Sequence, residues 1–216
     1  DILQYSANVQ TLNTPIAIAA TRTVNTASGD LTIGGAISGA GGVTKSGNYT
    51  LTLGGANSYS GSTTGSAGSL LVNGSIGSGV VSIASGATLG GAGTIGGAVT
   101  VASDCTMAPG ETPTSIGTLT LGAAPSLGGT IAMQINKTAG SVCTADQVNL
   151  TSGTLSYGGT LTVTELAGSA PLSGGEVFHL FDATGGFNAG SSFSIMSLPT
   201  LPTQTPVLNW YTGKLT

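Results

Sequence analysis

A short apolar segment recurs about every 20 residues along this chain, and a glycine turn closes most copies. A unit of this length is one supersecondary element that cannot bury its own apolar face, so successive units must stack. The spacing therefore predicts a solenoid of roughly eight to ten coils. The clearest copies are Asp30-Leu-Thr-Ile-Gly-Gly35, Thr50-Leu-Thr-Leu-Gly-Gly55 and Ser69-Leu-Leu-Val-Asn-Gly74, and looser ones lie at Val81–Ile83, Val99–Val101, Leu119–Leu121, Ile131–Met133, Val148–Leu150 and Leu161–Val163.

Composition favours a thin β core over a helical or disordered chain. Glycine accounts for 37 of the 216 residues, and charged residues for only 6%. Hydrophobic residues make up 39%, which is more than disordered chains carry. Tripeptides such as Leu31-Thr-Ile33 alternate apolar and polar side chains, as half-buried strands do. We expect the Gly-Gly and Ser-Gly pairs to supply corners with positive φ.

Charge and hydropathy argue against two kinds of partner. The net charge is −4, and the four basic residues lie far apart, whereas nucleic-acid binding needs clustered Lys and Arg. No apolar run reaches the ~18 residues of a membrane helix. We therefore expect no nucleic-acid partner and no membrane span. The chain begins at Asp1 without an initiator Met, which predicts a secreted product that has lost its signal peptide.

The sequence divides into three parts that differ in glycine content and in the pattern of apolar residues. Residues 1–25 form a glycine-free extended segment, which predicts an N-terminal arm; residues 26–165 are the repeat array; residues 166–216 predict a C-terminal cap. The cap contains the strand-like run Glu176–Phe181 and most of the large aromatic residues. Because uncapped solenoid ends present unpaired strand edges, we expect the arm to connect one subunit to the next. The predicted self-association residues are Ile2, Leu3, Tyr5, Val9, Leu12, Ile16 and Ile18.

The only two cysteines are Cys105 and Cys143. Neither belongs to a CxxC or Cys/His cluster, and both lie in polar, turn-like contexts. An even pair in an exported protein predicts a disulfide, so we expect a bond between Cys105 and Cys143. The alternative is two thiols that face the core or small pockets.

The run from Gly29 to Gly61 resembles the passenger-associated transport repeat, also called the autotransporter-associated β-strand repeat. The likeness continues through Leu70–Gly79, Ala87–Gly97 and Met107–Gly110. This resemblance implies a right-handed parallel β-helix that is exported to the surface of a Gram-negative-type bacterium. It also implies a role in display, adhesion or aggregation.

Candidate cofactor and metal residues are few. Gly91-Ala-Gly93-Thr-Ile-Gly96 fits the dinucleotide pattern GxGxxG, but Ala98–Ala102 after it has the pattern of a strand where that motif requires a helix. We interpret these glycines as coil corners and predict no cofactor. His179 is the only histidine, and one histidine cannot build a histidine metal cluster. Its alternation with Phe178 predicts an outward-facing imidazole.

Paired carboxylates are the remaining catalytic hypothesis, because parallel β-helices can cleave polysaccharides. Asp104 and Asp146 would approach each other if Cys105 bonds to Cys143, and they could then form a Ca²⁺ site or a catalytic pair. No Lys or Arg lies near either one in the sequence. We therefore predict no catalytic, cofactor-binding or metal-binding residue.

The sequence thus predicts an all-β, right-handed parallel β-helix with a non-catalytic structural function, secreted or held at the bacterial cell surface. We expect a self-associating subunit of a fibre or layer, joined head-to-tail, whose partner is a second copy of the chain. The alternative is a monomeric passenger that acts as an adhesin or carbohydrate-binding stalk on cell-surface carbohydrate or other cells. That role needs a side loop or exposed aromatic residues, and the candidates are Tyr5, Tyr49, Tyr59, Tyr157 and Tyr211. A polysaccharide-degrading enzyme is the third hypothesis.

Overall fold

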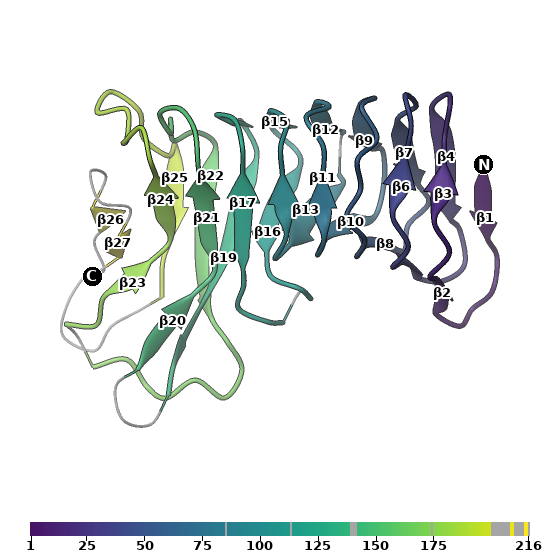
Figure 1. Cartoon of the computed structure of the whole chain (residues 1–216). Helices are drawn as coiled ribbons and strands as arrows, with labels where there is room; N and C mark the ends of the chain where they lie inside the picture. Colours follow the sequence, from purple (N-terminus) through teal and green to yellow (C-terminus); the bar gives the residue numbers. More distant parts are fainter. Residues whose placement is uncertain are drawn as a thin grey trace.

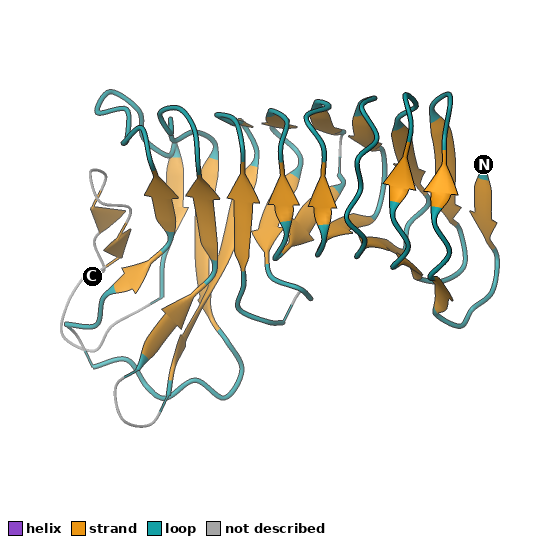
Figure 2. Cartoon of the chain, in the orientation of Figure 1, coloured by secondary structure: helices purple, strands orange, loops and turns teal. Residues whose placement is uncertain are grey.

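The computed structural model of the chain is a rod of stacked β-coils (Figure 1). It describes residues 1–84, 86–112, 114–138, 142–173, 175–199, 208–209 and 214–215. Within these ranges every regular element is a strand, joined to the next by turns and loops (Figure 2). The described part therefore contains no helix that could cross a membrane. The all-β prediction is confirmed.

Three long sheets run along the rod, and neighbouring coils pair in parallel. Nine strands of the ten-stranded sheet follow one another: β2 (Gln10–Leu12), β5 (Leu31–Ile33), β8 (Thr50–Leu53), β10 (Ser69–Val72), β13 (Thr88–Gly91), β16 (Thr106–Pro109), β19 (Thr130–Lys137), β22 (Thr160–Glu165) and β25 (Ile195–Ser197). The seven-stranded sheet contains β1 (Ile2–Gln4), β4 (Arg22–Thr26), β7 (Val43–Ser46), β9 (Thr63–Gly65), β12 (Val81–Ile83), β15 (Val99–Val101) and β18 (Ser126–Leu127). The five-stranded sheet contains β11 (Ser75–Ile76), β14 (Thr94–Ile95), β17 (Thr118–Leu121), β21 (Gln147–Leu150) and β24 (Phe181–Ala183), and β3 (Ile16–Ala17) pairs with β6 (Ile37–Ser38).

Two small features depart from this parallel pattern. β20 (Cys143–Ala145) folds back on the end of β19 as an antiparallel hairpin that projects sideways from the rod (Figure 1). A separate antiparallel sheet is made of β23 (Phe178–His179), β26 (Leu208–Asn209) and β27 (Lys214–Leu215). The run Glu176–Phe181 is therefore not one strand, because Phe178 and Phe181 belong to different sheets.

The repeat period corresponds to one coil. Leu31, Leu51 and Leu70 from the three clearest copies pair with one another in the ten-stranded sheet. The looser copies are distributed over all three sheets, since one coil holds up to three short strands. The predicted solenoid of stacked repeats is confirmed at this level.

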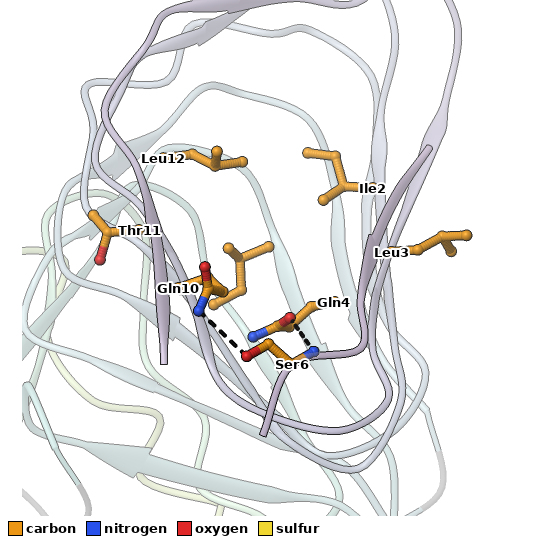
Figure 3. A pocket seen from close by; sticks show the side chains of 8 residues that line it. Ile2, Leu3, Gln4, Ser6, Gln10, Thr11 and Leu12 are labelled. Atoms are coloured by element: carbon orange, nitrogen blue, oxygen red, sulfur yellow. Dashed lines mark hydrogen bonds between the residues drawn. The ribbon is translucent and has the colours of Figure 1, made fainter. Parts of the chain in front are cut away.

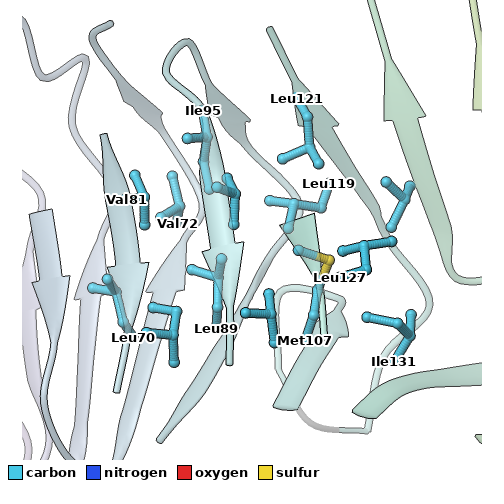
Figure 4. Packing of buried hydrophobic residues seen from close by; sticks show 14 of the residues in the cluster. Leu70, Val72, Val81, Leu89, Ile95, Met107, Leu119, Leu121, Leu127 and Ile131 are labelled. Carbon is cyan, nitrogen blue, oxygen red and sulfur yellow. The ribbon is translucent and has the colours of Figure 1, made fainter. Parts of the chain in front are cut away.

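Alternation along the strands separates a dry interior from a hydroxyl-rich surface. Figure 4 shows the interior, where Leu70, Leu89 and Met107 stack from coil to coil in the ten-stranded sheet. Because successive side chains of a strand point to opposite faces, the residues between them face outward. Six consecutive coils carry a hydroxyl at one outward position: Thr50, Ser69, Thr88, Thr106, Thr130 and Thr160.

Most Gly-Gly corners serve close backbone approach more than unusual φ angles. A Cβ placed on Gly55 would lie 2.5 Å from the carbonyl oxygen of Gly35 in the preceding coil, whereas one on Gly54 would meet nothing closer than 3.7 Å. Neither residue has a positive φ; Gly91, at φ 115°, does. The expectation of positive φ at every Gly-Gly pair was therefore wrong for this corner.

Residues 1–25 are not a separate arm: β1, β2 and β3 form the first coil, and Arg22 to Asn25 already belong to β4 of the second. β1 pairs with β4, β2 with β5 and β3 with β6, all in parallel. The absence of glycine, which suggested an arm, has a physical reason. A Cβ on Gly35 or Gly41 of the second coil would lie 2.2 Å from a carbonyl oxygen of the first coil. No described coil precedes the first one, so its own corners can carry side chains.

The solenoid also continues past residue 165. β24 pairs with β21 and β25 pairs with β22, both in parallel, so the segment expected to be a cap contributes a further coil. Tyr157, Phe187 and Phe193 pack together here, with ring centroids of Tyr157 5.6 and 5.1 Å from the other two. Trp210, which the sequence also assigned to the cap, lies outside the described residues.

Candidate self-association surface

The N-terminal end of the rod exposes the interior of the first coil. β1, β2 and β3 each stand at the edge of their sheet, so each is paired on one side only within the described part. Ile2 pairs with buried Val24 and Leu12 with buried Ile33, which places Ile2 and Leu12 in the inward rows. With no described coil above them, Leu12 remains 36% exposed and Ile2 is half-buried.

A hollow of about 260 Å³ opens at this end. In Figure 3, Ile2 and Leu12 point toward each other across the interior, while Leu3 and Thr11 point away from it. Leu31 of the second coil also lines the hollow. The hollow is therefore the uncovered end of the aliphatic column that fills the rod.

Two glutamines, which the sequence analysis did not select, shape the hollow. Gln4 is buried; its Nε2 donates to the carbonyl oxygen of Asn8 at 2.9 Å, and its Oε1 accepts from the Ser6 amide at 2.8 Å. Nε2 of Gln10 lies 3.5 Å from Oγ of Ser6 (Figure 3). These bonds brace the turn between β1 and β2, which borders the hollow.

The seven predicted self-association residues do not form one continuous surface. Leu3, Tyr5 and Val9 are 57%, 64% and 65% exposed. The other four lie in the interior rows: Ile2 and Leu12 line the hollow, Ile16 packs partly against the core, and Ile18 is buried.

The opposite end of the ten-stranded sheet is exposed as well. All three residues of β25 are exposed, with Ile195 at 63% and Met196 at 42%. Met196 pairs with buried Leu161, so it occupies the inward row that Leu31 and Leu51 occupy nearer the N-terminus. Sequence reasoning missed this edge, because Pro199, Pro202 and Pro206 follow it and prolines interrupt a strand pattern.

The predicted disulfide is not formed. The carbonyl of Cys105 accepts from Thr130 at the start of β19, whereas Cys143 pairs with Lys137 at the end of that strand. Seven residues of extended strand separate these points by roughly 23 Å, and a disulfide needs Cα atoms within about 7 Å. Cys105 is buried and its Sγ donates to the carbonyl of Ile83 at 3.1 Å; burial raises the pKa of this thiol.

Asp104 and Asp146 are not brought together. Asp104 precedes Cys105, whose carbonyl is hydrogen-bonded to Thr130 at the start of β19. Asp146 instead accepts hydrogen bonds from the amides of Gly117 at 2.9 Å and of Gln134, farther along β19, at 2.7 Å. Burial raises the pKa of Asp146 to about 7, although these two hydrogen bonds oppose the shift. Within the described residues no three His, Cys, Asp or Glu side chains are close enough to share a metal ion.

The remaining single-residue predictions have mixed outcomes. His179 is exposed between buried Phe178 and Leu180, so the outward imidazole is confirmed. Of the tyrosines considered for binding, Tyr5 and Tyr49 are exposed. Tyr59 and Tyr157 are buried in the core, and Tyr211 lies outside the described residues.

Lys45 is a buried cation that the sequence analysis passed over. Its Nζ donates to the carbonyl oxygens of Ser46, Gly47 and Ala67 at 3.0, 2.7 and 2.9 Å. Burial lowers the pKa of this amine to about 8, and the nearby Asp30 carboxylate partly offsets the effect. Because its three bonds join two adjacent coils, Lys45 stabilises their spacing.

The side hairpin is held by a second missed lysine. Nζ of Lys137 donates to the carbonyl of Pro171, to Oγ of Ser173 and to the carboxylate of Glu176. The hydrogen bond from Lys137 holds the pKa of Glu176 well below its usual range. This cluster fastens the loop after β22 against the end of β19.

Comparison with known proteins adds no family assignment. No protein-family model matches the chain, and no curated protein sequence matches it.

Proposed function

We propose that this protein is a non-catalytic structural rod of the bacterial cell surface that associates end to end with further copies of itself. The observation that carries the proposal is the first coil, whose interior and strand edges no described residue covers. Unpaired strand edges recruit further strands, and exposed apolar surface costs ~25 cal/mol per Å². The end of a second rod would pair these strand edges and cover the apolar surface.

The repeat resemblance supports the rest of this proposal. It favours a right-handed coil and export to the cell surface, where a stiff rod serves display or aggregation. The low content of charged residues, 6% of the chain, suits a repetitive structural surface more than a catalytic one.

A second candidate function is that of a monomeric passenger acting as an adhesin or carbohydrate-binding stalk. The β19–β20 hairpin favours this second function, because a binding stalk needs a loop that projects sideways from the rod, and the hairpin projects in this way. Exposed Val142 at the tip side of this hairpin adds apolar surface. Polysaccharide cleavage has less support, since Asp104 and Asp146 stand apart.

The test compares assembly of the native chain with that of two lysine variants. Leu12→Lys places a charge in the end hollow, whereas Val80→Lys changes an exposed apolar residue midway along the rod. In negative-stain microscopy and sedimentation at high protein concentration, the native protein and Val80→Lys should form rods longer than one molecule. Leu12→Lys should stay monomeric. A native protein that remains monomeric would overturn the proposal and favour the passenger.

A further inference from the structure

The two most exposed strands of the rod are the two ends of one sheet. Among strands whose side chains are described, only β2 and β25 have all residues exposed. Both close the ten-stranded sheet, β2 at the N-terminal end and β25 at the C-terminal end. We propose that β25 of one molecule pairs in parallel with β2 of the next, and this rests on the end-to-end function proposed above.

The internal ladder fixes the register of such a joint. Along the sheet, the inward row runs from Gln10 through Leu31 to Leu161 and Met196. Continuing it places Met196 of one molecule against Gln10 of the next. Leu198, which packs partly against the core, then faces Leu12 across the joint. These inward side chains would fill the hollow of about 260 Å³ without burying a charge.

The corners limit the joint to one strand pair. Within the chain, coils approach closely because glycine occupies positions such as Gly35 and Gly41, where a Cβ would meet the preceding coil. The first coil has side chains at its corners, so a partner cannot stack on the whole end equally closely. At the other end, the last strand of the seven-stranded sheet among the described residues is β18, while the ten-stranded sheet reaches β25.

The area available makes this a weak joint. A coil of about 20 residues at ~3.3 Å each outlines an end face of roughly 400 Å² once side chains are included. Even two complete faces would bury only about 800 Å², which is below the usual size of stable interfaces, and a joint through one strand pair buries less. Edge-strand hydrogen bonds and the buried Met196 and Leu12 side chains supply the specificity. Assembly should therefore require high local concentration, such as a crowded cell surface provides.

Cysteine cross-linking tests the register. In a background of Cys105→Ser and Cys143→Ser, one protein carries Thr11→Cys and a second carries Ser197→Cys, two outward positions that lie opposite each other in this joint. Mixing and mild oxidation should give a disulfide-linked heterodimer on a non-reducing gel. Pairing Thr11→Cys with Ile195→Cys, displaced by two residues or ~6.6 Å, should give at least several-fold less.

Microscopy of the native protein separates the two proposals. Long rods together with the in-register cross-link support both. Long rods with no preference for Ser197→Cys over Ile195→Cys would overturn this joint and leave end-to-end association standing. Monomers without any cross-link would overturn both.

Discussion

Asp146 should make stability depend on pH. Its pKa in the folded state, about 7, lies above the ordinary value, so the folded protein retains a proton that the unfolded chain releases. The stabilisation is complete below about pH 4 and is lost as the pH rises through about 7, on the order of 1 kcal/mol per pH unit at most.

Urea unfolding of the native protein, followed by circular dichroism from about pH 4 to pH 7.5, should show this decline. Asp146→Asn should flatten the profile, and the matched variant Asp182→Asn, which alters an exposed carboxylate, should retain it. An equally steep profile in Asp146→Asn would assign the pH dependence to other groups.

Other side chains show where sequence patterns suffice and where they fail. His179 was placed correctly because alternation with period two needs only its neighbours Phe178 and Leu180. The prediction of a Cys105–Cys143 bond was wrong because it depends on which part of β19 lies beside each cysteine, and the repeat did not predict the length of this eight-residue strand. Lys45 was missed because a lysine in an alternating strand ordinarily faces outward, whereas here three carbonyl oxygens compensate its burial.

At the scale of the element, the coil was predictable and its ends were not. The near-copies that contain Leu31, Leu51 and Leu70 are so alike that each leucine could be expected to stack on the next, as it does in the ten-stranded sheet. The first coil was mistaken for an arm because glycine was treated as the mark of a repeat, although glycine marks only positions that another coil approaches. The side hairpin was missed, yet the long alternating run Thr130–Lys137 is a signal that could have revealed it.

Two adjacent glycines provide a test of this role. Gly55→Ala places a Cβ 2.5 Å from the carbonyl oxygen of Gly35, so neighbouring coils must separate, at a cost of about 1–3 kcal/mol. Gly54→Ala meets nothing within 3.7 Å and should change the free energy of unfolding by less than about 0.5 kcal/mol. Chemical denaturation measures both. If both variants lose the same free energy of unfolding, the glycines are needed for backbone conformational freedom and not for the close approach of neighbouring coils.

At the scale of the whole molecule, the described part of the rod has two unlike ends. The N-terminal end is an open aliphatic column, whereas the C-terminal interior is packed with the rings of Tyr157, Phe181 and Phe193. Unlike ends associate head to tail, and such contacts propagate into open chains when no rotation closes them. The repeat predicted a rod whose ends need an arm or a cap, but only the strand pairing showed that β2 and β25 belong to the same sheet.

Removing residues 1–20 should increase association. The truncation uncovers the second coil, whose inward Leu31, Ile33 and Ile37 are all buried in the intact protein. That coil also has glycine at corners such as Gly35 and Gly41, so another end can approach it more closely than it can approach the native first coil. Sedimentation at matched concentrations should show larger assemblies for the truncated chain, with an unchanged β-type circular dichroism spectrum. A truncated chain that stays monomeric would mean that the side chains of the first coil themselves make the contact between subunits, and that an exposed apolar end is not sufficient for assembly.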